Sequence, residues 1–269
     1  MRRLTLALWL VLQAVPVRAQ FQPRPLNDPA TGESYHIEGA AGLWFPGAAM
    51  SISSQSLGIQ GSTIIDFKTD LGLQDQHFPE VHLELRPATR HKFRFQYIPI
   101  DYDQTATPDR DLIFNGQRYR AGLPVHSTLD WKAYRAGYEY DFLTTNRWFA
   151  GVIADLKYTD VTATLVTGTN APEFTHAQAP IPALGGVFRI YPVANISVTG
   201  EITGFTLPEG LIKNSSGHYL DVNVYGTLNF TDNLGVQAGL RSFDVGYLVK
   251  TDTGSFTLTG LFFGVVARY

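Results

Sequence analysis

Apolar and polar residues alternate along the last stretch of the chain, from Phe256 to Tyr269. Every second residue there belongs to an apolar row that contains Leu261, Phe263, Val265 and Tyr269. A period of two is typical of a β-strand, because successive side chains point to opposite faces. An apolar strand edge promotes aggregation in a soluble sheet, whereas a barrel closed within a membrane has no edge and places such a row on lipid. The pattern therefore predicts that this strand closes a transmembrane barrel.

The same alternation predicts ten strands in all. They cover residues 35–45, 78–86, 93–98, 134–142, 150–158, 184–190, 196–203, 220–228, 234–241 and 256–269. Pro99 has no backbone N–H to donate, so we expect the third strand to end or bulge there. A hairpin arm at Ser62–Phe67 would change the count, which leaves eight or twelve strands as alternatives.

The connections between these strands alternate in length. Short connections follow the even strands, at 87–91, 143–147, 192–195 and 230–233, whereas long ones follow the first four odd strands, at 49–77, 103–125, 159–178 and 206–217. The fifth odd strand is an exception, with a short connection near 250–254. Within the second long connection, Asn115-Gly116 favours a hairpin turn. Short periplasmic turns and longer outer loops are typical of outer-membrane barrels.

Composition supports a barrel and excludes several other classes. Charged residues make up only 17% of the chain, yet no internal apolar run reaches the ~18 residues that a membrane helix needs. A net charge of −3 gives no electrostatic basis for nucleic-acid binding, and the absence of cysteine excludes disulfides and thiolate sites.

The N-terminus has the pattern of a targeting segment. Arg2 and Arg3 precede an apolar stretch, and small or modest residues at Val17 and Ala19 suit cleavage before Gln20. We therefore predict a signal peptide at residues 1–19, a polar periplasmic lead-in at 20–33 and the barrel at 34–269.

Aromatic residues gather at both ends of the predicted strands, and Trp131 is among those expected in the outer aromatic belt.

Several segments resemble those of known membrane barrels. The final strand, with its terminal Tyr269, resembles the assembly signal of bacterial outer-membrane β-barrels. The segments TDLGL, FPEVHLELRP, RHKFRFQYIPIDYD and WKAYRAGYEYDF resemble uncharacterised outer-membrane β-barrel proteins of Gram-negative bacteria. This resemblance implies an outer-membrane location, with lipid, lipopolysaccharide and the barrel-assembly machinery as partners. It carries no catalytic or binding residues.

The strand faces opposite the apolar rows carry charges of both signs. The inward-facing set is Glu38, Glu80, His82, Glu84, Arg86, Arg94, Arg135, Glu139, Asp155, Lys157, Arg189, Glu201 and Arg241. A ten-stranded barrel is only slightly wider than an eight-stranded one, whose lumen side chains fill. The charges are therefore predicted to pair and close the lumen, and we expect Glu201 to pair with Arg189 or Arg241. A narrow channel for ions or small solutes is the alternative.

Catalytic and metal-binding roles receive weaker support, and we predict neither. Glu80, His82 and Glu84 share one strand face, as metal binding or acid–base chemistry would need, but that face also lines the lumen. His126-Ser127 has no identified acid partner, and the outer-rim residues His126, Asp130, His176 and His218 would have to converge to form a hydrolase site. The residues Asp101, Asp103, Asp109 and Asp111 lack the spacing of a calcium loop. The predicted role is structural or surface-interacting, with the outer loops available to an extracellular ligand.

Overall fold

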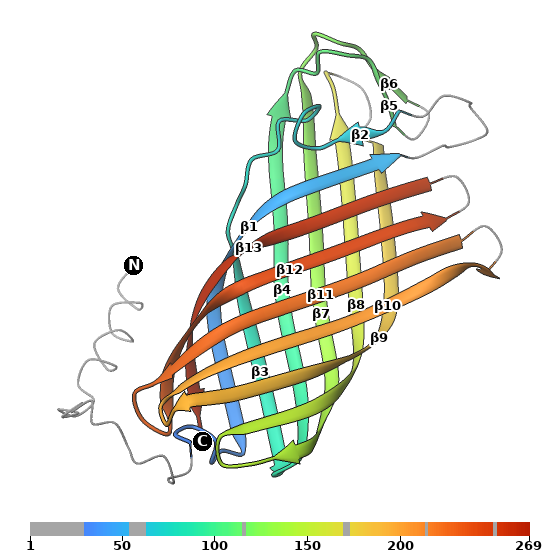
Figure 1. The fold of residues 1–269 in the computed structure, drawn as a ribbon. Coiled ribbons are helices and arrows are strands. Elements are labelled where there is room, and N and C mark those ends of the chain that lie inside the picture. The colour runs from blue at the N-terminus through green and yellow to red at the C-terminus, as the bar shows by residue number, and fades with distance from the viewer. Residues whose placement is uncertain (1–29, 54–62, 115–116, 169–172, 213–214, 250–251) are drawn as a thin grey trace.

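A computed structural model describes residues 30–53, 63–114, 117–168, 173–212, 215–249 and 252–269. Ten long antiparallel strands form the barrel shown in Figure 1. They are β1 (Ile37–Ser53), β3 (Phe78–Ala88), β4 (His91–Ala106), β7 (Val125–Thr144), β8 (Trp148–Val166), β9 (Glu173–Val193), β10 (Ile196–Ile212), β11 (Ser215–Asn229), β12 (Leu234–Val249) and β13 (Asp252–Arg268).

The barrel is closed by the pairing of β13 with β1, which runs from Glu38↔Arg268 to Ser53↔Thr253. This confirms the predicted all-β fold, the count of ten strands and the closing role of the last strand. Leu261, Phe263 and Val265 are exposed on the outer surface of β13. No helix within the described residues is long and apolar enough to cross a membrane.

Each long strand reverses its inside–outside polarity partway along its length. In the half of β7 nearest the short turns, Tyr134 and Tyr138 face outward while Glu139 is buried in the lumen. In the half nearest the long connections, Trp131 is buried in the lumen while Asp130 faces outward. The strand is therefore apolar-out in one half, which we name the membrane half, and apolar-in in the other, which we name the outer half.

The same reversal on β13 sets the height of the lipid-facing surface. Its outward row is apolar from Leu261 to Tyr269 and consists of Ser and Thr at positions 253–259. A membrane-spanning strand needs about 9–11 residues, which the apolar part supplies. The strands continue further, to 21 residues in β9. The outer half therefore projects beyond the hydrocarbon layer and buries its apolar side chains inside the barrel, as a water-soluble barrel does.

This projection corrects the predicted strand ends. Most of the connections predicted at 159–178 and 206–217 belong to extended strands, whereas only the two ends of the connection predicted at 103–125 do. Only the first two connections after odd strands are therefore long. The third strand does not end at Pro99, because β4 stays paired with β7 through Pro99↔Lys132 while its pairing with β3 stops at Tyr97. The predicted aromatic belt was wrong for Trp131, which packs on Phe243 inside the lumen, with ring centroids 5.1 Å apart.

The first two long connections cover the outer mouth of the barrel. The first carries β2 (Ile65–Asp66), which pairs with β1, so the segment at Ser62–Phe67 adds no strand to the barrel. The second carries the hairpin strands β5 (Leu112–Phe114) and β6 (Gln117–Tyr119). The tip of this predicted hairpin, Asn115-Gly116, lies outside the described residues.

A polar contact joins the two covering connections. Arg110 donates two hydrogen bonds to the Asp70 carboxylate, at 2.8 and 2.6 Å, and these bonds lower the pKa of Asp70. Fully buried side chains from both connections, Leu71 and Phe114 among them, pack into the apolar interior of the outer half. The outer mouth is therefore filled by protein.

Candidate functional site: the charged lumen

All thirteen residues predicted to face the lumen lie on the inner face of the barrel, in or next to its membrane half. They come from β1, β3, β4, β7, β8, β9, β10 and β12 and form ion pairs and hydrogen bonds that cross the barrel. Buried charges are stable only when they are paired and hydrogen-bonded. The geometry of these pairs therefore decides whether the lumen is open.

The central layer of charges surrounds Glu201 on β10. Its carboxylate accepts a hydrogen bond from Arg94 at 2.5 Å and lies 3.6 Å from the Arg135 guanidinium. Arg94 also contacts Glu139 at 2.8 Å and Glu84 at 3.7 Å, so one guanidinium connects three carboxylates.

The predicted partners of Glu201 were therefore wrong. Arg189 instead donates to Thr199 and Glu33, and Arg241 contacts Asp221 and Glu80. The prediction considered nearby strands, whereas in a narrow barrel a long arginine on β4 reaches across the lumen to β10. Strand order alone does not identify such partners.

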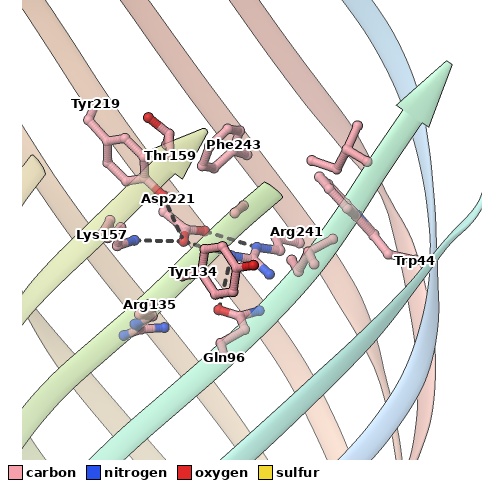
Figure 2. Close-up of a pocket in the computed structure, with 13 residues that line it drawn as sticks. Trp44, Gln96, Tyr134, Arg135, Lys157, Thr159, Tyr219, Asp221, Arg241 and Phe243 are labelled. Carbon is pink, nitrogen blue, oxygen red and sulfur yellow. Dashed lines mark hydrogen bonds and ion pairs between the residues drawn. The ribbon is translucent and has the colours of Figure 1, made fainter. Parts of the chain in front are cut away.

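A second layer of charges lies at the boundary with the outer half, and Figure 2 shows its residues Lys157, Asp221 and Arg241. Asp221 accepts hydrogen bonds from Lys157 at 2.8 Å and from Arg241 at 2.9 Å. Arg241 also lies 3.4 Å from Glu80 and stacks over the Trp44 ring, with 5.5 Å to its centroid. This layer thus joins β1, β3, β8, β11 and β12 across the barrel.

A third layer lies toward the short-turn end, around Lys92. Its ammonium is 2.6 Å from Glu139 and 3.0 Å from Asp141, and it lies 3.8 Å from the centroid of the Phe149 ring. Near the same end, Arg268 donates to Glu38 at 2.5 Å.

The prediction missed several charged residues of the lumen. Lys92, Asp141, Asp221 and Arg268 were not among the predicted lumen residues, although each follows the alternation of its strand. Asp141, Asp221 and Arg268 already lie within the predicted strands, on the face opposite the apolar row, and extending the third predicted strand by one residue would have added Lys92. Glu33 gave no such signal, because it precedes the first strand.

Residues 30–36 close the mouth at the short-turn end. Thr31 donates its backbone N–H to Ala194 and accepts a hydrogen bond from Asn229, and the Arg86 side chain donates to the Glu33 backbone carbonyl. The predicted lead-in at 20–33 is thus described only from residue 30, where it enters the barrel. The predicted signal peptide at 1–19 lies outside the described residues.

The Glu33 carboxylate fixes this segment in place. It lies 3.1 Å from Arg86 and 3.0 Å from Arg189, and it accepts a hydrogen bond from the Tyr191 hydroxyl. Burial alone would raise the pKa of Glu33, but the charges of Arg189, Lys92 and Arg86 and the Tyr191 hydrogen bond lower it to about 2.

Two small cavities interrupt the packed lumen. One, of about 20 Å³, lies beside Lys157, Asp221 and Arg241, and the other, of about 40 Å³, lies between His82, Arg94 and Glu201. A water molecule needs about 10–15 Å³ of such space. Each cavity is therefore large enough for at least one water molecule next to the ion pairs.

The other candidate sites do not assemble. Glu80 contacts Arg241 and His82, whereas Glu84 is held by Tyr35 and Arg94. Within the described residues no group of three or more His, Asp or Glu side chains is arranged to hold a metal ion.

The outer-rim and acidic-loop residues also lie apart. His126 and Asp130 face outward on β7, whereas His218 faces outward on β11 and contacts Asp244 at 3.3 Å. The side chain of His176 lies outside the described residues. Asp101 and Asp103 face outward on β4, Asp109 is exposed, and Asp111 pairs with Arg118 in the covering hairpin.

Comparison with known proteins supports the fold. No protein-family model matches the chain, and no curated protein matches it by sequence. Its structure is similar to the crystal structure of the outer membrane protease OmpT from Escherichia coli, with a TM-score of 0.57 and 7% identity over 90% of this chain and 99% of that one. The Pseudomonas putida toluene transporter TodX also matches, with a TM-score of 0.33, 10% identity and coverage of 91% of this chain and 93% of that one. The translocator domain of the autotransporter NalP from Neisseria meningitidis matches with a TM-score of 0.37, 10% identity and coverage of 91% of both chains.

The chain thus has the fold of an outer-membrane β-barrel. At 7% identity the likeness to OmpT shows the fold alone.

Proposed function

We propose that the protein is a closed outer-membrane barrel with a structural or surface-interacting role, in which the membrane half anchors an outer half that faces the exterior. The observation that carries this proposal is the set of ion pairs that fills the lumen in three layers. Arg94–Glu201 and Lys157–Asp221 cross the barrel, and Lys92–Glu139 joins neighbouring strands near the short-turn end.

Two features support a lumen that does not conduct. Residues 30–36 fill one mouth, and the connections that carry β2, β5 and β6 fill the other. The paired charges also leave no excess of one sign along the path, whereas an ion-selective pore presents rings of one sign.

The outer half and its covering connections are the surface that the proposal assigns to interaction with an extracellular ligand. Its exterior is polar and its interior is apolar and packed, so it holds a fixed shape above the membrane. The proposal assigns no catalytic residue, since His126 on β7 and His218 on β11 are separated by three strands on one side of the barrel wall and by five on the other.

Conductance in a planar lipid bilayer tests the closed lumen. The purified, refolded protein is expected to be electrically silent at insertion levels where a porin, added as the positive control, gives unit steps. Reproducible unit steps with an ion preference would refute the closed barrel and favour the narrow channel. A variant that carries both Arg94→Gln and Glu201→Gln tests the central layer, because loss of its ion pair should raise the frequency of transient openings.

A further inference from the structure

The barrel wall is incompletely paired between β9 and β10. Their pairing runs from Ile196↔Val193 to Gly204↔Leu184 and stops there. Both strands continue beyond this point, since β9 pairs with β8 as far as Glu173 and β10 pairs with β11 as far as Ile212. The edges 173–183 of β9 and 205–212 of β10 therefore face a seam in the outer half, and in Figure 1 the two strands diverge there.

One other gap lies above the start of β3, between β1 and β4, and its β1 side is covered. Above the start of β3, the edge of β1 contacts the first long connection, through Phe67 N–H to the Met50 carbonyl at 3.0 Å and Ala48 N–H to Asp75 at 3.1 Å. No described residue covers the β9–β10 seam through a hydrogen bond of this kind. The seam is therefore the junction where two strand edges remain without a partner from the described chain.

Two prolines explain why the seam is open. In an antiparallel strand, alternate residues direct their N–H and C=O groups to the same neighbour. Pro180 and Pro182 are two residues apart, and β9 stays paired with β8 across both, at Tyr158↔Pro180 and Leu156↔Pro182. Their nitrogens therefore face β10, where two hydrogen-bond donors are missing.

The seam begins at the outer boundary of the lipid-facing surface. Leu184, in the last β9–β10 pair, is 74% exposed on the outer wall, and Ile202 beside it on β10 is 52% exposed. Four residues further along β9 toward the outer half, Pro180 lies opposite the outward-facing Tyr158, and Asp160 follows on β8. The unpaired edges therefore stand directly above an apolar wall that contacts acyl chains.

We propose that the β9–β10 seam binds one lipopolysaccharide molecule of the outer leaflet. Its sugar head group hydrogen-bonds to the unpaired backbone groups of the seam, and an acyl chain lies on Leu184 and Ile202 below. Continuity with the lipid-facing surface supports this occupant, since a head group and its chain match a polar edge above an apolar wall. An extended peptide fits less well, because Pro180 and Pro182 blunt the β9 edge against strand addition.

Hydrogen exchange tests whether the seam is open. In the folded protein in nanodiscs, amides at 205–212 are expected to exchange faster than amides at 242–249 on β12, which have partners on both sides at the same height. Equal protection of the two segments would overturn the proposal. Replacing both Pro180 and Pro182 by Thr restores two donors and should slow exchange at 205–212, whereas Pro99→Thr on β4 serves as the matched control.

Lipid retention tests the occupant. Native mass spectrometry of the protein in mild detergent with rough lipopolysaccharide should show one retained molecule, bound about tenfold more weakly by the double-proline variant and by Leu184→Asn. Unchanged retention by both variants, or equal retention of phosphatidylethanolamine, would overturn the proposal. Leu184→Asn leaves both strand edges intact, so it decides the outcome if the double variant fails to fold. None of these measurements depends on conductance, so the proposed closed lumen can fail separately.

Discussion

Replacing Glu201 by Gln is the most direct test of the central ion-pair layer. The change keeps the shape of the side chain and removes one negative charge. The Glu201 carboxylate contacts Arg94 at 2.5 Å and Arg135 at 3.6 Å, and it accepts a hydrogen bond from the Tyr225 hydroxyl at 3.3 Å. Removing one partner of a buried ion pair usually costs about 3–5 kcal/mol, because an uncompensated charge stays buried.

The remaining partners place the expected loss at the lower end of that range. Arg94 keeps Glu139 at 2.8 Å, and Arg135 keeps Asp155 at 2.7 Å. We therefore expect Glu201→Gln to lower the free energy of unfolding by about 3 kcal/mol. Asp130→Asn is the matched control, since the Asp130 side chain is 56% exposed and surface changes of this kind stay within about 0.5 kcal/mol.

Equilibrium urea unfolding of the protein in lipid vesicles, followed by tryptophan fluorescence, measures both variants. A lower midpoint with an unchanged slope would report lost stability without a change in the surface exposed on unfolding. If the midpoint of Glu201→Gln matches that of Asp130→Asn, the central layer does not stabilise the barrel and the reasoning is wrong.

A double-mutant cycle identifies the partner. Glu201→Gln and Arg94→Gln touch, so their effects should couple by about 1–3 kcal/mol. The coupling between Glu201→Gln and Arg241→Gln should be smaller, because Arg241 is bound to Asp221 and Glu80 instead. If the coupling with Arg241→Gln were the larger of the two, it would support Arg241 as the partner of Glu201, as the sequence predicted.

Three further predictions concern the lower mouth, the lipid face and the outer half. The pKa of Glu33 is lowered from 4.5 to about 2, so the Glu33 ion pairs hold residues 30–36 in the barrel mouth most firmly above pH 4.5 and weaken as the pH falls toward 2. Hydrogen exchange at residues 30–36 should show this pH dependence, and Glu33→Gln should abolish it. Phe263→Arg places a charge on the lipid-facing wall and should cost about 2–4 kcal/mol in urea unfolding, whereas Ser255→Arg, higher on the same outward row, should be nearly neutral. Trp131→Ala should cost about 3–5 kcal/mol, since it empties a fully buried site in the outer half, and an unchanged midpoint would contradict the packed interior.

The membrane half of the fold could be predicted from the sequence because lipid imposes a simple rule. Outward residues must be apolar there, so rows such as Leu261, Phe263 and Val265 identify the strands, and the short turns between them fix the pairing order. The lumen residues followed from the same alternation. The ion-pair partners did not, since side chains such as Arg94 and Lys157 cross the barrel to strands that are distant in both sequence and strand order.

The outer half was misread because its alternation continues with the opposite polarity. On β7 the apolar positions are even-numbered below the reversal, as at Tyr134 and Tyr138, and odd-numbered above it, as at Leu129 and Trp131. A search for apolar residues on one fixed face therefore ends at the reversal and assigns the remainder to a loop. The sequence does carry a signal of the reversal: the apolar positions shift by one residue, and no turn separates the two halves of the strand. In a membrane barrel that signal marks where the strand leaves the lipid, since the solvent outside changes from hydrocarbon to water while the backbone and its pairing continue unchanged.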